Sequence, residues 1–463
     1  MQKQVIDEKY INSLLTNMKS PTKKEAMAVI NKARRKKGLA LQDVAVLINI
    51  DGRGEVTSPL QNELFKAAAK VKNDIYGERV VFFAPLYTSD YCVNDCQYCN
   101  FHITNRISRR KRLSLNEVAE QVRFLIGMGH KRILLESGED STKNNIDYII
   151  SVIKKIYSVK TKKGNIRRIN VNIAATTEEN YRKLKSAHIG TYQLFQETYH
   201  RKTYEDLHKG PKQDYNRQIT AHLRAFKAGI DDLGIGVLFG LYDWRFEALA
   251  LIAHAQYMEK VLGVGPHTIS VPRFRPAPTV TYKPQYPVSD KDFLKLITIL
   301  RLAVPYTGLI LSTRETPVIR RQAFKIGISQ ASAASVTAVG GYGVLKNQRQ
   351  FFVADERPLK AVIDSIIKDK LLPSFCTACY RSGRTGERFM DITKPGNIHN
   401  YCRPNGLLTF AEYLEDFAVS GVLYKKGYAL IRHYLDKITD RDLRKKTEDR
   451  LINIKQGKRD LYF

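Results

Sequence analysis

The strongest constraint on the fold is a regular alternation of short apolar runs with amphipathic segments between residues 80 and 340. The runs are rich in β-branched and aromatic residues, and the segments between them carry apolar residues at helical spacing. The eight runs are residues 80–86, 132–139, 169–175, 189–197, 232–241, 267–273, 307–315 and 332–340. The helical segments include 115–128, 177–186, 214–227 and 245–261. Strands that alternate with helices predict an α/β fold with a parallel (βα)8 TIM-type barrel over residues 78–345.

An open, doubly wound sheet is the alternative fold. No glycine-rich dinucleotide-binding fingerprint follows the first run, so the pattern favours the barrel. Residues 1–77 read as an N-terminal helical extension. Residues 346–463 read as a separate, mainly helical C-terminal domain.

The chain has 463 residues and a formal net charge of +30. Its basic runs are dispersed and no nucleic-acid-binding module accompanies them, so we do not expect nucleic acid as a partner. An acidic electron donor, a flavodoxin or ferredoxin, suits the charge better. There is no apolar run long enough for a membrane span and no apolar core of a signal peptide, so we expect a cytoplasmic protein.

Three of the six cysteines, Cys92, Cys96 and Cys99, lie within eight residues with the spacing C-x3-C-x2-C. Three thiolates in one loop can each bind one iron of a [4Fe–4S] cluster and leave the fourth iron open to a small molecule. Structural zinc instead requires four ligands, and the spacing is one ligand short. The pattern therefore predicts an open iron–sulfur site directly after the first barrel strand.

The other three cysteines, Cys376, Cys379 and Cys402, form a C-x2-C-x22-C group in the C-terminal region. Spacing alone allows a zinc site completed by His399 or another residue. Since no further cysteine exists in the chain, a second three-thiolate cluster with one open iron is the preferred interpretation.

The first cysteine motif resembles that of the radical S-adenosylmethionine (SAM) superfamily. The resemblance implies that the open iron of the cluster binds SAM, which is cleaved reductively to methionine and a 5′-deoxyadenosyl radical. It further implies that Tyr98 lies beside the adenine and that Ser137-Gly138-Glu139, a variant of the family's G-G-E motif, meets the methionyl amine. We expect Glu197 to contact the ribose or amine and Arg217 the SAM carboxylate, with a surface ion pair as the alternative for each.

With both cysteine groups, the whole chain resembles the [FeFe]-hydrogenase maturase tyrosine lyases, the HydG family. The segments that carry this resemblance are residues 195–199, 208–211, 265–273, 311–315 and 375–386. It implies radical cleavage of the Cα–Cβ bond of L-tyrosine to p-cresol and dehydroglycine, followed by formation of carbon monoxide and cyanide. These ligands end in an Fe(CO)2(CN) synthon for the hydrogenase cofactor, so other hydrogenase maturation proteins are expected partners.

The same resemblance assigns further residues. Arg314, at the end of the seventh run, is the candidate clamp for the tyrosine carboxylate, and Ser329 is expected to add a hydrogen bond. In this family the C-terminal cluster carries an additional iron that free L-cysteine can bridge, and His267 is the expected ligand of that iron. A lone histidine is otherwise more often a hydrogen-bonded core residue, and Arg314 could form a structural salt bridge.

Three alternatives to this function remain from the sequence. One is a tyrosine lyase of the thiamine pathway (2-iminoacetate synthase), which shares the first cysteine motif and lacks the second. Another is an RNA-modifying radical SAM enzyme, suggested by the basic charge. The last is a non-enzymatic iron–sulfur scaffold, which would bind clusters without cleaving SAM.

Overall fold

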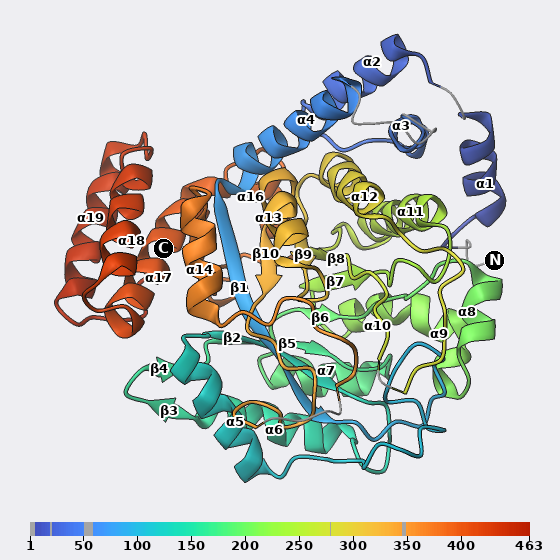
Figure 1. The fold of residues 1–463 in the computed structure, drawn as a ribbon, viewed down its shortest axis with the longest axis horizontal. Helices are drawn as coiled ribbons and strands as arrows, with labels where there is room; N and C mark the ends of the chain where they lie inside the picture. Colours follow the sequence, from blue (N-terminus) through green and yellow to red (C-terminus); the bar gives the residue numbers. More distant parts are fainter. Residues whose placement is uncertain (1–4, 19–20, 51–58, 278, 345–348) are drawn as a thin grey trace.

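The computed structural model describes residues 5–18, 21–50, 59–277, 279–344 and 349–463. Its centre is a closed barrel of eight parallel strands, which confirms the predicted fold class (Figure 1). The strands are neighbours in the order β10-β9-β8-β7-β6-β5-β2-β1, and β10 pairs with β1 to close the ring. The barrel strands are β1 (Arg79–Ser89), β2 (Arg132–Ser137), β5 (Arg168–Asn172), β6 (Tyr192–Gln193), β7 (Leu233–Gly236), β8 (Thr268–Ser270), β9 (Gly308–Leu311) and β10 (Gln330–Ser332).

Seven strands fall within or closely match their predicted runs, and the eighth prediction is wrong in position. β10 ends at Ser332, where residues 332–340 were expected to form the strand. Its parallel pairing with β1 spans only Val81↔Gln330 to Phe83↔Ser332. Ala334 then takes a φ of 50°, which leaves the extended conformation, and the following apolar residues form a loop over the barrel mouth.

Helices surround the barrel where the periodicity predicts them, with one break. The predicted helix over 214–227 is split at Thr220 into two short helices. The helices and short elements of this ring are α5 (Leu115–Met128), α6 (Ile146–Ser158), β3 (Lys160–Thr161), β4 (Gly164–Asn165), α7 (Glu178–Ser186), α8 (Arg201–Leu207), η1 (Pro211–Gln213), α9 (Tyr215–Ile219), α10 (Ala221–Lys227), α11 (Trp244–Leu262), α12 (Asp290–Ala303) and α13 (Pro317–Ile326). The ends of α5 show why helix boundaries can be predicted from the sequence. Ser114 and Glu117 form a capping box at its start, and Gly129 ends it with a φ of 108°.

The N-terminal segment is helical as predicted and packs on the outside of the barrel, in blue at the top of Figure 1. Its α4 contacts α12 and α13 of the ring. The four helices are α1 (Glu8–Asn17), α2 (Lys23–Ala33), α3 (Leu41–Ile48) and α4 (Pro59–Tyr76).

The C-terminal region is mainly helical, and it also supplies a strand that the sequence did not predict. This strand, β11 (Leu372–Ser374), extends the barrel sheet by pairing with the first residues of β1, from Arg79↔Leu372 to Val81↔Ser374. Its helices are α14 (Leu359–Lys368), α15 (Ala378–Arg381), α16 (Gly386–Thr393), α17 (His399–Phe417), α18 (Val422–Leu435) and α19 (Arg441–Lys455). The predicted boundary at 345/346 lies outside the described residues, and the three-domain division stays a prediction.

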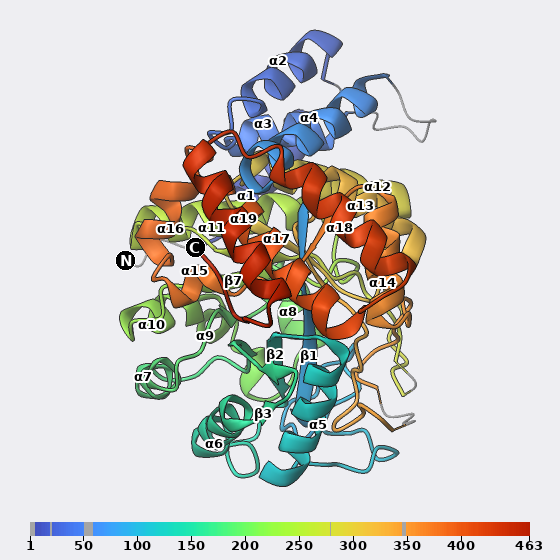
Figure 2. The same cartoon turned by 90° about the vertical axis from the view of Figure 1, so that its left-hand side faces the viewer.

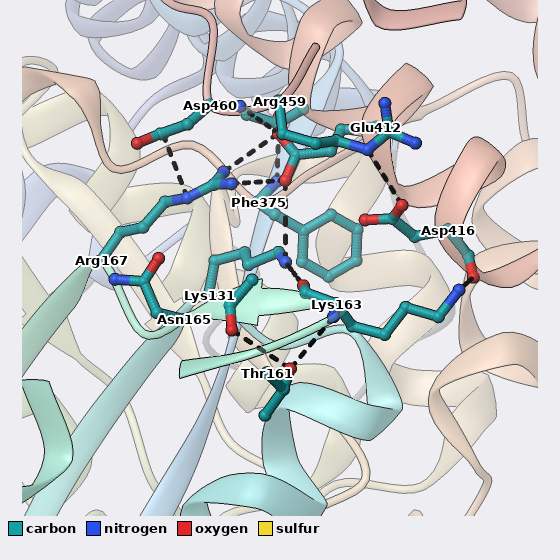
Figure 3. Close-up of polar contacts among 12 residues, drawn as sticks. Lys131, Thr161, Lys163, Asn165, Arg167, Phe375, Glu412, Asp416, Arg459 and Asp460 are labelled. Atoms are coloured by element: carbon teal, nitrogen blue, oxygen red, sulfur yellow. Dashed lines mark hydrogen bonds and ion pairs between the residues drawn. The ribbon is translucent and has the colours of Figure 1, made fainter. Parts of the chain in front are cut away.

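A buried ion-pair network joins this C-terminal region to the barrel (Figure 3). Arg167, just before β5, donates two hydrogen bonds to Glu412 of α17, and its Nε lies 3.0 Å from Asp460. Lys131 adds a second cation 3.6 Å from Glu412, whose side chain is only 4% exposed. Figure 2 shows α17, α18 and α19 in front of the barrel strands. β11 packs against α17.

No helix in the described part of the chain is both long and apolar enough to cross a membrane.

Candidate active site

The first cysteine group lies at the C-terminal mouth of the barrel, directly after β1. Cys92, Cys96 and Cys99 all line a cavity of about 200 Å³ that the barrel strands enclose. Burial raises the pKa of the Cys99 thiol to about 11 and the pKa of Cys96 well above its ordinary value, and the neighbouring thiols add to both effects. Three thiols thus share one enclosed space, at the end of the barrel where TIM-barrel enzymes carry their active sites.

Gly138 is fitted against the cysteine loop so closely that no side chain is possible there. A Cβ at this position would lie 2.3 Å from the carbonyl oxygen of Tyr91 and 3.1 Å from the Cβ of Cys92. The Gly138 N–H donates to the Ser89 carbonyl, and Asn144 donates to the carbonyls of both Gly138 and Tyr91. The Ser137-Gly138-Glu139 segment therefore braces the cysteine loop from β2, and all three of its residues line the cavity.

Glu139 and Arg217, which the sequence assigned to different parts of SAM, form an ion pair with each other at 2.6 Å. Asn94 of the cysteine loop donates to the second Glu139 oxygen at 2.7 Å. Arg217 also donates to the carbonyls of Ala175 and Pro211, and it is not among the residues lining the cavity with the cysteines. The geometry therefore presents Arg217 as a support for Glu139.

Glu197 lines the cavity and pairs with Lys212 at 2.8 Å. Its φ of 67° is an uncommon conformation for a residue other than glycine, and such strain is frequent at functional sites. Lys212 lines the same wall, and the carboxylate of Glu197 helps to raise its pKa despite the opposing effect of burial. Tyr98 also faces the cavity, and its hydroxyl lies 2.7 Å from His208 Nε2. Sequence reasoning missed Lys212, because no motif marks it.

Arg314 reaches the cavity from the end of β9, and the structure separates it from Ser329. Its guanidinium lies 3.4 Å from the ring centroid of Phe351, and no carboxylate among the described residues lies within ion-pair distance of it. Ser329 lies before β10, where its carbonyl accepts from Val81, and it is not among the residues lining the cavity. A joint contact of Arg314 and Ser329 with one carboxylate is therefore not supported. Among the described residues, Arg314 thus has no partner for the structural salt bridge that was its alternative role.

Glu136 is a cavity residue that the sequence did not single out. It lies at the end of β2, and two strands, β1 and β10, separate β2 from β9 on that side of the ring. Burial raises its pKa to about 8, against the opposing effects of Asn172 and Arg314. The cavity thus contains Arg314, a cation without a carboxylate partner among the described residues, and Glu136, an acid that is largely protonated at neutral pH.

The second cysteine group lies at the other end of β1. Cys376 follows β11, Cys379 lies in α15, and Cys402 lies in α17, where Arg79 of β1 donates to its sulfur at 3.0 Å. Burial raises the pKa of Cys402 to about 12, with Cys379 and Cys376 adding to the effect and Arg79 opposing it. Cys376 and Cys402 are thus both held at the start of β1, the first through the pairing of β11 with β1 and the second through Arg79.

His267 and His399, the two histidines considered as ligands here, differ in their surroundings. His267 precedes β8, stacks on Phe389 of α16 with ring centroids 4.0 Å apart, and has its Nδ1 3.5 Å from Asp232. Its Nδ1 makes no hydrogen bond in the structure. His399 instead has its Nδ1 2.7 Å from the carbonyl oxygen of Gly396.

Both thiol groups have the donor chemistry of iron–sulfur sites. In the part of the chain that the structure describes, no three or more His, Cys, Asp and Glu side chains are close enough together to hold a single metal ion. Each group offers three thiols, one for each of three irons of a cubane. A cation accompanies each group, Lys212 the first and Arg79 the second, and a nearby cation favours the thiolate form that binds iron.

Comparisons with known proteins find family models and relatives that are similar to this chain. The Radical SAM superfamily model matches residues 86–253, and the Biotin and Thiamin Synthesis associated domain model matches residues 270–371. The 2-iminoacetate synthase of Escherichia coli (strain K12) is 31% identical over 329 residues, which are 70% of this chain and 85% of the relative. The 3-methylornithine synthase of Methanosarcina acetivorans is 28% identical over 58% of this chain and 71% of its own length.

Two solved structures are similar over nearly the whole chain. The crystal structure of HydG, a maturase of the [FeFe]-hydrogenase, is 51% identical with a TM-score of 0.95 and covers 99% of this chain and 100% of its own. The HydG structure from Carboxydothermus hydrogenoformans is 39% identical with a TM-score of 0.84, covering 96% and 97%. Methylornithine synthase, at 21% identity and a TM-score of 0.61, shares the fold.

Proposed function

Since this chain belongs to the radical SAM superfamily and is a HydG-like lyase of that superfamily, we propose that its substrate is L-tyrosine and its role [FeFe]-hydrogenase maturation. The superfamily implies a [4Fe–4S] cluster and SAM, which together supply a 5′-deoxyadenosyl radical when bound. We assign the cluster to Cys92, Cys96 and Cys99. The radical would break the Cα–Cβ bond of tyrosine to release p-cresol and dehydroglycine.

The observation that carries this proposal is the extent of the similarity. The family models end at residue 371, before Cys376, whereas the HydG structure covers 99% of the chain, including the second cysteine group. A tyrosine lyase of the 2-iminoacetate synthase type accounts for the barrel alone. We therefore assign Cys376, Cys379 and Cys402 to an auxiliary [4Fe–4S] cluster that carries an additional iron, and we assign His267 as a ligand of that iron. Carbon monoxide and cyanide would form at this end of the barrel.

The residues around the cavity suit an amino-acid substrate. Arg314 is a cation without a carboxylate partner among the described residues, and its planar fork can bind a substrate carboxylate through two hydrogen bonds. Glu136 and Asn172 provide a polar wall that can receive a second polar group of the same molecule.

Around SAM, we assign Tyr98 to the adenine, the 137–139 segment to the methionyl amine, and Glu197 to the ribose or amine. Strand ends and the loop after β10 enclose these groups and keep bulk water from a radical.

We also propose a cytoplasmic location. The proposed reaction predicts a defined set of products. Anaerobically reconstituted protein given SAM, dithionite and L-tyrosine should form p-cresol together with 5′-deoxyadenosine, and then cyanide and carbon monoxide. Formation of 5′-deoxyadenosine without p-cresol would rule out tyrosine as the substrate. Formation of p-cresol without carbon monoxide would favour the 2-iminoacetate synthase type of reaction.

A further inference from the structure

The segment that follows the first cysteine group, residues 103–112, is an exposed basic loop. It contains Arg106, Arg109, Arg110, Lys111 and Arg112 and no acidic residue, although Lys111 pairs with Glu117 of α5 at 2.6 Å. Two apolar side chains on it, Ile103 and Ile107, are 50% and 80% exposed. Large apolar residues ringed by like charges are typical of surfaces that bind another protein, because the apolar atoms anchor the contact and the charges steer it.

Hydrogen bonds tie the basic loop directly to the cysteine loop. The Ile103 N–H donates to the Asn94 carbonyl at 2.8 Å, and the His102 N–H donates to the Cys99 carbonyl at 3.1 Å. The Arg110 guanidinium donates to the carbonyls of Asp90 and Phe101. A molecule that docks on this loop therefore lies against the polypeptide that carries the three thiols.

Further cations lie on other segments that contact the cysteine loop. Lys209 is exposed, and its carbonyl accepts from the Asp95 N–H at 3.1 Å. Lys283 is exposed next to Tyr282, whose ring packs against the apolar cluster that includes Cys96. The acidic Asp95 is bonded to His102 and Thr104. The positive charge beside the cysteine loop therefore comes from three separate segments.

A second basic element, the helix α19, does not share these features. α19 mixes its cations with Asp442, Glu448 and Asp449, and Lys446 pairs with Asp442 at 2.6 Å on the same helix. It belongs to the C-terminal region, which joins the barrel at the N-terminal end of β1. α19 thus carries six cations and three acids, and it lies away from the mouth of the barrel.

We propose that the basic loop 103–112, flanked by Lys209 and Lys283, is the docking surface for a small acidic electron-carrier protein. The inference rests on the proposed function, which requires one electron for each SAM cleaved. One electron passes from the reduced carrier to the cluster held by Cys92, Cys96 and Cys99, so the carrier is oxidised by one electron and no atoms are transferred. Attraction between the acidic carrier and this surface raises the association rate and weakens with salt.

The test compares two charge-reversed variants of the reconstituted holoenzyme that change the net charge equally. Arg106→Glu/Lys209→Glu alters the proposed surface, and Arg441→Glu/Lys445→Glu alters exposed positions of α19. The probe is reduced flavodoxin, and stopped-flow absorbance follows its oxidation in the presence of SAM and without tyrosine. Calorimetry with oxidised flavodoxin measures binding without turnover.

We expect the surface variant to lose about tenfold or more in the second-order rate and in affinity at low salt, with a smaller dependence on salt. The α19 variant should keep the wild-type values. With dithionite, a small reductant that needs no docking, all three proteins should form 5′-deoxyadenosine at the same rate.

Four results would overturn the proposal. Equal losses in both variants would mean that only total charge matters. An unchanged flavodoxin rate in the surface variant, or tight RNA binding that this variant alone loses, would assign the loop to another role. A parallel loss of the dithionite rate would mean that the substitutions damage the site itself. Because no readout involves tyrosine, the proposed substrate can fail while this surface stands.

Discussion

At the scale of single residues, the site depends on a few side chains whose burial decides their chemistry. Arg314 is enclosed against Phe351 and has no carboxylate partner among the described residues. A buried cation without an anion is costly, and a bound substrate carboxylate would remove that cost. The same reasoning separates it from Arg273, which is near the mouth but pairs with both Glu315 and Asp290.

Replacing Arg314 with methionine keeps much of the packing against Phe351 and removes the charged fork. We expect the KM for tyrosine to rise about 10- to 100-fold, because a charge-assisted hydrogen bond contributes roughly 1.5–3 kcal/mol. Initial rates of p-cresol formation against tyrosine concentration measure this. Formation of 5′-deoxyadenosine without tyrosine serves as the control and should not change. An unaltered KM would remove Arg314 from the tyrosine site.

Glu136 gives a prediction about pH. Its pKa is about 8 in the folded protein and 4.5 when unperturbed, so the folded state binds the extra proton between these values. The contribution of Glu136 to the free energy of unfolding therefore falls as the pH rises from about 5 to about 8. Glu136→Gln should flatten this decline in anaerobic thermal unfolding of the holoenzyme. Glu247, whose pKa burial also raises to about 8, leaves a residual slope. An identical pH profile in the variant would contradict the assignment.

Residues inside motifs could be predicted from the sequence, and isolated ones could not. The three cysteines and the 137–139 segment have characteristic spacing, and the structure brings them to one cavity. Lys212 and Glu136 reach the cavity through the path of the chain around the barrel, which no local pattern encodes. Ser329 lies before β10, which begins two residues earlier than the expected strand, and its contact with the substrate stays a prediction.

At the scale of elements, the long periodic helices and most strands could be predicted, and short pairings could not. α5 matches its predicted range of 115–128, since a capping box and a C-terminal glycine mark both ends. β11 has only three residues, and its place in the sheet depends on pairing with β1, a partner almost 300 residues earlier in the chain. Such non-local pairing leaves no signal in a local pattern.

The ion pairs between α17 and the barrel provide a prediction at this scale. Glu412→Ala leaves Arg167 and Lys131, each with a side chain only 5% exposed, without their shared carboxylate. Removing one partner of a buried pair costs about 3–5 kcal/mol, and we expect a loss of that size in the free energy of unfolding. Lys66→Ala, in an exposed pair with Glu63, should cost no more than about 1 kcal/mol. Urea titration measures both, and equal losses would contradict the role of the network.

At the scale of the whole molecule, the barrel separates two thiol groups. The first follows the last residue of β1, and the second lies beside its first residues. An 11-residue strand spans roughly 35 Å at about 3.3 Å per residue, so the groups lie too far apart to share one substrate molecule directly. The proposed reaction therefore divides into bond cleavage at one end and later chemistry at the other.

This separation predicts that the two activities can be uncoupled. Cys376→Ala should leave p-cresol formation within about twofold of wild type, because the first site is untouched, and should strongly reduce carbon monoxide, trapped with deoxyhaemoglobin. Cys96→Ala, the matched substitution in the first group, should abolish both products. Equal loss of p-cresol in the two variants would show that the groups act as one site.

EPR of the anaerobic, reduced holoenzyme shows whether two separate three-thiolate clusters each keep one open iron. We expect two distinct cluster signals, with iron and sulfide for two cubanes. SAM should shift one signal, free L-cysteine should shift the other, and Cys376→Ala should eliminate only the second. A single signal, or zinc in place of iron at either cysteine group, would rule out two open clusters.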